Sequence, residues 1–229
     1  MTGSDSTARR RLRLYGRPAF MPAIVYFLLS ILRPAGPIAW ECAEHGKSRF
    51  SLVELPYRIA VLVYLFNSRG RMLLLKRCRS PNLDLYSPVG GKLEQAGGES
   101  PFACALREIA EETGQRLTLA DIRLMGIVSE KAFEGRGHWL MFCFESLTAV
   151  NFPAHEIPEG KLEWVDPAAV GELEIPQSDR QIIWPLVQQH SMNLNPGGPG
   201  SRAEIFSVHI DCSDGQQGMQ PVLEQSRRI

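Results

Sequence analysis

The chain has 229 residues, which allows one large domain or one domain with extensions. Lys plus Arg and Asp plus Glu balance at 25 each, so the basic excess typical of nucleic-acid binders is absent, and we expect no nucleic-acid partner. The five cysteines form no CxxC pair, which argues against a zinc knuckle or a disulfide framework and favours reduced, buried thiols. No sequence feature indicates an oligomeric state.

Residues 1–54 do not match the pattern of the rest. A basic stretch at 9–17 precedes an apolar run at 20–32, an order that resembles a secretory signal, although the run is shorter than the roughly 20 residues of a membrane span. The globular pattern begins abruptly at Leu55, and a bacterial gene can start at a leucine codon. Three interpretations follow: a start at Leu55, a signal or anchor, or a genuine cytosolic extension. The first and third predict a cytoplasmic protein and the second an exported or anchored one; we expect no membrane contact from 55–229.

From Leu55 onward, strands and helices alternate. Tyr57–Phe66 is apolar and β-branched, which predicts a buried strand. A turn at Asn67–Gly70 leads to Arg71–Lys76, which we expect to be the return strand of a hairpin. Further strands are expected at Arg123–Ser129, His138–Glu145, Lys161–Val165 and Ile205–Ile210. With the helices described next, the pattern predicts an α/β or α+β fold with a mixed sheet.

The C-terminal part contains one helix and a polar end. Residues 178–190 carry apolar side chains at helical spacing, which predicts a helix. Residues 213–229 are polar, and we expect a tail that frays. The chain therefore divides into an N-terminal extension (1–54), a globular domain (55–212) and a polar tail (213–229).

A helix is predicted from Ser100 to Thr113. Ser100 is a favourable N-cap, Pro101 suits the first helical position, and Gly114 suits the C-terminal cap. One face of this helix is apolar at the spacing i, i+3, i+4, i+7, through Phe102, Ala105, Leu106 and Ile109.

The other face of this helix carries three glutamates that stability alone would not select. Glu108, Glu111 and Glu112 lie at i, i+3 and i+4, where like charges repel by roughly 0.2–0.5 kcal/mol per pair. Glu111 and Glu112 also lie in the last turn, where the helix dipole disfavours anions. A bound hard cation would reverse both penalties, because Mg²⁺ prefers carboxylate oxygens. A solvated acidic face is the alternative.

The segment that includes this helix resembles the Nudix box, G-x5-E-x7-R-E-U-x-E-E-x-G-U, where U is apolar. The matching residues are Glu99, Arg107, Glu108, Ile109, Glu111, Glu112 and Gly114. Seven residues instead of five separate Gly91 from Glu99, so Gln95–Gly98 resembles a two-residue insertion in a loop. The last apolar position of the motif is Gln115 here.

The resemblance implies the Nudix fold over 55–212, a mixed sheet between helices. It implies that Glu108, Glu111 and Glu112 bind Mg²⁺, with Mn²⁺ as a substitute. It further implies that Arg107 pairs with Glu99 in a structural role.

The family's chemistry also implies residues for catalysis and substrate binding. Gly90 and Gly91 let the backbone approach phosphate and metal closely, and Lys92 could contact a phosphate. Family members often use an acid outside the box, which points to Glu130 or Glu134 in the expected loop after Arg123–Ser129; His138 could assist. The predicted catalytic set is Glu108, Glu111, Glu112 and Glu130, and substrate contacts are predicted at Tyr86, Ser87, Gly91 and Lys92.

The implied activity is Mg²⁺-dependent hydrolysis of a phosphoanhydride bond in a nucleoside di- or triphosphate-like substrate. Residues 161–186 resemble the tail of MutT-like diphosphatases, but Ser87 stands where some members have a base-reading Asn. Hydrolysis of nucleotide sugars, dinucleotides or coenzyme A derivatives is an alternative. A non-catalytic nucleotide sensor is disfavoured, because the box acids are present and no basic helix-turn-helix pattern follows residue 150. The aromatic residues that could stack on a base are Phe133, Trp139, Trp164 and Trp184.

Overall fold

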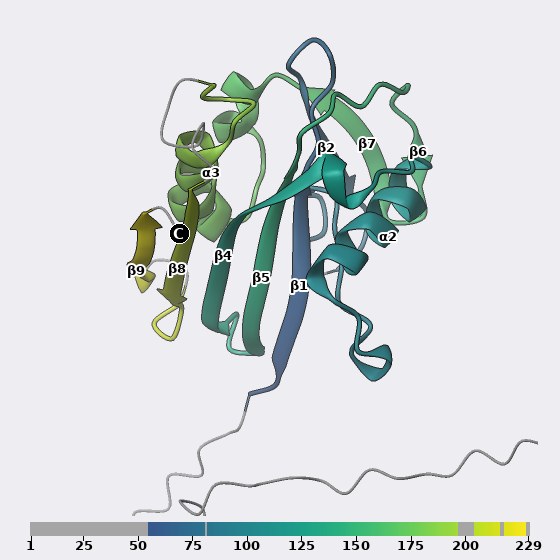
Figure 1. Ribbon diagram of the computed structural model, residues 1–229. Coiled ribbons are helices and arrows are strands. Elements are labelled where there is room, and N and C mark those ends of the chain that lie inside the picture. The colour runs from purple at the N-terminus through teal and green to yellow at the C-terminus, as the bar shows by residue number, and fades with distance from the viewer. Residues whose placement is uncertain (1–54, 81, 197–203, 216–217, 228–229) are drawn as a thin grey trace, which may run out of the picture. The chain divides into compact units, whose positions relative to one another are not determined.

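A computed structural model describes residues 55–80, 82–196, 204–215 and 218–227 (Figure 1). Residues 1–54 lie outside the described ranges, so the three interpretations of this segment stay predictions. Within the described ranges the strands form two sheets. None of the helices in these ranges is long and apolar enough to span a membrane.

The larger sheet is mixed and has the strand order β1-β5-β4-β8-β9. Parallel pairing joins β1 to β5 and β4 to β8, and antiparallel pairing joins β4 to β5 and β8 to β9. The bounds of these strands are β1 Tyr57–Tyr64, β4 Ile122–Phe133, β5 Gly137–Ser146, β8 Ile205–Asp211 and β9 Gln220–Arg227. The predicted mixed sheet is thus confirmed.

The smaller sheet is antiparallel and has the order β3-β2-β7-β6. Its strands are β2 Met72–Arg77, β3 Tyr86–Ser87, β6 Glu156–Ile157 and β7 Gly160–Val165.

The predicted hairpin between 57–66 and 71–76 forms only next to its turn. β1 pairs with β5 and β2 pairs with β3 and β7, so the two strands belong to different sheets. Next to the turn, the Leu73 amide donates to the Leu65 carbonyl at 2.9 Å, and an antiparallel bridge joins Phe66 to Met72. β1 is the end strand of the larger sheet, yet it is buried on both faces, and isolated bridges to Val89 and Lys92 lie along its other side.

The core lies on both faces of the larger sheet, because side chains alternate along its strands. In β1, Val61 and Val63 belong to one buried cluster, and Ala60 and Tyr64 belong to the other. The first cluster includes residues of helix α2 (Pro101–Thr113), which packs on β1. The second includes residues of α3 (Trp184–His190), which packs on β4 and β8. The sheet therefore lies between helices, as the family resemblance implies (Figure 1).

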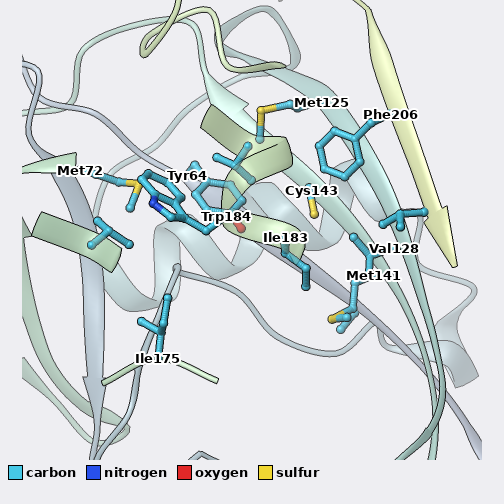
Figure 2. Close-up of a cluster of buried hydrophobic side chains, with 14 of the residues drawn as sticks. Tyr64, Met72, Met125, Val128, Met141, Cys143, Ile175, Ile183, Trp184 and Phe206 are labelled. Atoms are coloured by element: carbon cyan, nitrogen blue, oxygen red, sulfur yellow. The ribbon is translucent and has the colours of Figure 1, made fainter. Parts of the chain in front are cut away.

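The shorter helical segments connect these layers. They are the 3₁₀ helices η1 Gln95–Gly97, η2 Leu119–Asp121 and η3 Pro167–Glu172, and a π-helical turn, η4 Asp179–Ile183, that leads into α3. The helix predicted over 178–190 is therefore confirmed. Figure 2 shows Ile183 and Trp184 of this segment among the buried side chains of the α3-side cluster.

The C-terminal tail is corrected by the structure. Residues 220–227 form β9, which pairs along its length with β8, from Ile205 opposite Arg227 to Asp211 opposite Gln220. Val222 and Leu223 remain more than half exposed, so β9 is held by backbone pairing more than by burial. This explains why its polar sequence reads as a tail.

Candidate active site

Helix α2 begins and ends where its capping residues predict. The Ser100 hydroxyl accepts a hydrogen bond from the Ala103 amide at 3.2 Å. Gly114 adopts the left-handed conformation at φ 70°, and its amide donates to the Ala110 carbonyl. Cys104, Ala105 and Ile109 are fully buried against the sheet. This anchoring fixes the direction in which the glutamate face points.

Arg107 binds several acids at once. Its guanidinium meets Glu99 through two contacts, Nε to Oε1 at 2.8 Å and Nη2 to Oε2 at 3.0 Å. Its Nη1 also donates to Glu108 at 2.7 Å and to Glu111 at 3.0 Å. The hydrogen bonds from Arg107 hold the pKa of Glu99 at about 2. The ion pair expected between Arg107 and Glu99 is therefore present, and it extends to two glutamates of the helix.

The two-residue insertion lies at an exposed tip beside this network. η1 occupies the tip, and Gly98 adopts the left-handed conformation there. Its base is closed by Glu94 and Glu99: the Glu99 amide donates to the Glu94 carbonyl, and the Glu94 amide donates to the Glu99 carboxylate at 2.8 Å. The network at Arg107 thus depends on the base of the loop and not on its tip.

Deleting Gly97 and Gly98 should therefore leave activity within about twofold, because the tip supports no group of the cleft. Turnover and thermal melting of the deletion variant provide the test. An unfolded or inactive variant would show that the tip has a structural task.

The glycine loop before the tip is packed tightly between β1 and α2. The Val61 amide donates to the Gly91 carbonyl at 2.9 Å, which ties the loop to β1. A Cβ at Gly91 would lie 2.1 Å from Oε1 of Glu108. A Cβ at Gly90, where φ is +155°, would lie 2.1 Å from the Val61 carbonyl oxygen. Both positions therefore require glycine because the loop packs so closely on β1 and α2.

A cleft of about 490 Å³ opens beside the glycine loop and the glutamate face. The predicted site residues that line it are Ser87, Gly91, Lys92, Glu108, Glu111, Glu112 and Glu130. The lining does not include Tyr86, whose hydroxyl donates to Glu163 at 2.9 Å, or Glu134, which pairs with Arg136 at 3.4 Å. His138 also lies outside the lining, where Nδ1 accepts from the Ala132 amide.

Glu112 is the most buried glutamate of the helix face. Glu112 is only 7% exposed, and its Oε2 has no hydrogen-bond partner. Burial, followed by the charge of Glu108, raises the pKa of Glu112 to about 8. Burial also raises the pKa of Glu108, whereas Glu111 is 59% exposed. Buried carboxylates without a partner cost free energy unless a cation binds to them.

The donor set fits a hard divalent cation. Carboxylate oxygens are its preferred ligands, and Glu112 offers an orphaned one. Among the described residues, no three acidic, histidine or cysteine side chains already converge on a common metal position. Glu108 and Glu111 are both bound by the Arg107 guanidinium.

A second acidic group lies elsewhere in the cleft. Glu130 was expected in a loop, but it lies within β4, is 4% exposed and has an unpartnered Oε1. Beside it is Asp179, the first residue of η4, which the sequence analysis did not identify. Burial raises the pKa of Glu130 to about 7; burial and then the charge of Glu130 raise that of Asp179 to about 7. The only sequence signal for Asp179 was its position at the start of a predicted helix.

Two charged residues near Glu112 were also missed. Glu159 and Arg77 line the cleft, and both act on the pKa of Glu112, Glu159 raising it and Arg77 lowering it. Glu159 immediately precedes β7, and Arg77 ends β2. Neither lies in a motif, so only the pairing of β2 with β7 brings them to the site.

The four candidate stacking aromatics divide into two pairs. Phe133 and Trp139 line the cleft, and the Lys92 ammonium lies 5.9 Å from the Trp139 ring centre. Trp164 instead donates from its indole to the Phe152 carbonyl at 2.8 Å, and Trp184 is buried in the core.

A mixed sheet between helices, with a glutamate-bearing helix and a glycine loop at one cleft, defines the class of this site. The model of the NUDIX domain family matches residues 56–184, more than half of the chain. The chain belongs to the Nudix family and is a Nudix hydrolase.

Individual relatives agree with this assignment. The chain is 31% identical over 126 residues to a putative 8-oxo-dGTP diphosphatase of Bacillus subtilis, covering 55% of this chain and 78% of that protein. It is 31% identical over 142 residues to an RNA pyrophosphohydrolase of Novosphingobium aromaticivorans, covering 53% and 85%. The crystal structure of a mutator MutT protein from Bacillus halodurans superposes with a TM-score of 0.53 at 26% identity, covering 72% and 97%.

Proposed function

We propose that this chain is a Mg²⁺-dependent hydrolase of a phosphoanhydride bond in a nucleoside di- or triphosphate-like substrate, with Mn²⁺ able to replace Mg²⁺. The observation that carries the proposal is the face formed by Glu108, Glu111 and Glu112 at one cleft, with a buried, unpartnered oxygen on Glu112. The relatives named as a diphosphatase and a pyrophosphohydrolase support this substrate class.

Glu108, Glu111 and Glu112 are the residues that would hold the cation. When bound, the cation neutralises phosphate oxygens and lowers the pKa of the attacking water. Arg107 is a positioning residue: it holds Glu108 and Glu111 in the cleft, and its double contact with Glu99 fixes the guanidinium.

The phosphate chain of the substrate is bound by positively charged and polar groups of the cleft. Lys92 is exposed at the rim of the cleft, where its ammonium can meet phosphate oxygens. Gly91 lets the substrate approach the backbone closely, and Ser87 offers a hydroxyl. The Tyr86 hydroxyl is bound to Glu163, so Tyr86 supports the wall of the site and its predicted substrate contact is not retained.

The proton of the attacking water needs an acceptor, and the acids outside the box that line the cleft are Glu130, Asp179 and Glu159. Glu130 was predicted for this role from the sequence, but its neighbours are Ser178 and Asp179. The charge of Glu159 raises the pKa of Glu112, so Glu159 lies near the glutamates of α2. We therefore assign the acceptor role to Glu159.

Glutamine variants separate these two assignments. Glu159→Gln should lower kcat at saturating substrate by about 10²-fold, the size expected for loss of a general base. Glu130→Gln should act mainly on KM. Glu134→Gln, outside the cleft, is the matched control and should behave as wild type. A kcat loss confined to Glu130→Gln would restore the assignment made from the sequence.

The substrate class is tested by phosphate and pyrophosphate release over a panel of nucleotides, nucleotide sugars, dinucleotides and coenzyme A derivatives. Release from nucleoside triphosphates, dependent on Mg²⁺, is the expected result. Preferred release from another group would select that alternative. Tight nucleotide binding without any release would instead indicate a sensing module, which the full set of box glutamates disfavours.

A further inference from the structure

The helix that ends the α3 layer contains an irregular turn near its start. Residues 177–190 form one continuous helical segment, but Asp179–Ile183 within it form the π-helical turn η4. The Trp184 amide donates to the Asp179 carbonyl five residues earlier, whereas an α-helix pairs residues four apart. The segment therefore holds one more residue at η4 than a regular α-helix would.

Pro185 accounts for this irregular turn. It follows Trp184 inside the helical segment, where it has no N–H to donate to the Gln181 carbonyl. In a regular α-helix the proline ring would also collide with that carbonyl. A single π-helical turn changes the hydrogen-bond partners by one residue and relieves both problems. Pro185 is exposed and lies outside the lining of the cleft, so any effect it has on the cleft passes through the helix.

Both ends of η4 are fixed by the rest of the domain. At its C-terminal end, Ile183 and Trp184 are buried in the α3-side cluster (Figure 2). At its N-terminal end, the Arg180 guanidinium donates to the carbonyls of Gly171 and Leu173, the latter at 2.6 Å, where η3 ends. The extra residue of η4 therefore sets the direction of the first helical residues relative to the buried ones.

This direction decides which side chains face the cleft. Ser178 and Asp179 both line it. Burial is the largest cause of the raised pKa values of Tyr64, Cys143 and Asp179, and charge adds to it: Asp179 acts on Tyr64 of β1 and Cys143 of β5, and Glu130 of β4 acts on Asp179. The Asp179 carboxyl therefore points toward the larger sheet. With the buried end fixed, an α-helical turn would rotate Ser178 and Asp179 by about 100° around the helix axis, because such a helix has 3.6 residues per turn.

We propose that Pro185 is a positioning residue for the cleft: it prevents an α-helical turn and so keeps η4 in the π-helical form that points Ser178 and Asp179 into the cleft. A proline inside a helix lowers the stability of that helix, so stability alone would not select it here. Local departures of this kind are expected where a site requires them. The part of the inference that concerns substrate rests on the proposed function.

The test is Pro185→Ala, which supplies the missing N–H and removes the ring. We expect α-helical pairing, with a Tm that stays the same or rises. Asp179 should then turn away from Glu130, and its pKa, about 7 in the wild type, should fall toward the ordinary value of about 4, as followed by carbon NMR over a pH titration. KM should rise roughly tenfold with kcat within about twofold, as for loss of a hydrogen bond to a charged group.

A rescue variant separates helix geometry from a general effect of the substitution. Deleting the exposed Gln181 from the Pro185→Ala protein removes the extra residue, so a regular α-helix again points Asp179 into the cleft. The raised pKa of Asp179 should return, and KM should come within about threefold of the wild type. Pro167→Ala is the matched control and should change neither value, because Pro167 begins η3, where no N–H is needed, and lies outside the cleft lining.

An unchanged Asp179 pKa in Pro185→Ala would overturn the proposal, and so would a marked loss of Tm, which would show that the proline stabilises the helix. A lowered pKa with an unchanged KM, or a Gln181 deletion that restores neither value, would also overturn it.

These readouts separate the inference from the proposed function. The titration of Asp179 reports the direction of its side chain even when no phosphoanhydride is cleaved. Mg²⁺-dependent hydrolysis by the wild type and by Pro185→Ala, with equal KM and equal titration, overturns the positioning role and leaves the hydrolase assignment intact.

Discussion

Glu112→Gln is expected to lower kcat by about 10²-fold or more, because a cation ligand that supplies several kcal/mol of charge stabilisation is lost. The structural reason is specific to this residue: Glu112 is buried in the cleft with one oxygen unpartnered. The neutral amide keeps the size of the side chain and removes its charge. The fold should persist, because a buried neutral group replaces a carboxylate whose pKa burial has already raised to about 8.

Glu111→Gln should also lose activity, although its side chain is exposed, because it shares the face and the cleft. Glu94→Gln, in the exposed loop, is the control. Turnover is measured over a Mg²⁺ titration, and Mn²⁺ affinity is measured separately by electron paramagnetic resonance. Near wild-type turnover at saturating Mg²⁺ in both variants would contradict the metal assignment.

The parts of the site that the sequence predicts are those coded by local signals. Ser100 and Gly114 set the ends of α2, and the spacing of Glu108, Glu111 and Glu112 follows from the helical period. The pairing of Arg107 with Glu99 was implied by the family motif and is present. These features depend on residues close in sequence, so one segment is enough to predict them.

The parts that escaped prediction depend on pairing between distant segments. β1 pairs with β5 although β2 follows it directly, and a turn signal between β1 and β2 cannot show that the chain changes sheet. The polar β9 becomes a strand only through its hydrogen bonds with β8. Glu159 and Asp179 enter the cleft through β7 and η4, and neither carries a motif of its own.

Gly90→Ala is expected to cost both stability and activity. The residue adopts φ +155°, which side chains rarely tolerate, and its Cβ would lie 2.1 Å from the Val61 carbonyl oxygen and 3.0 Å from the carbonyl carbon. These are backbone atoms of β1, so relief requires the loop to move away from the strand. Strain of this kind is worth about 1–3 kcal/mol. At about 2–4 °C per kcal/mol for a domain of this size, Tm should fall by several degrees.

Activity should fall further than stability, because the Gly90 backbone amide also lowers the pKa of the Glu112 carboxyl. A displaced loop moves the Gly90 amide away from Glu112. It also moves Gly91 relative to Glu108, on which Gly91 packs so closely that a Cβ would lie 2.1 Å from Oε1 of Glu108. Gly97→Ala is the matched control, since a Cβ there meets nothing within 4 Å. It should keep the wild-type Tm and kcat. If Gly90→Ala also kept both, the tight contact between the glycine loop and β1 would not be what positions the glutamates, and the geometry of the cleft would have to be maintained by the Arg107 network alone.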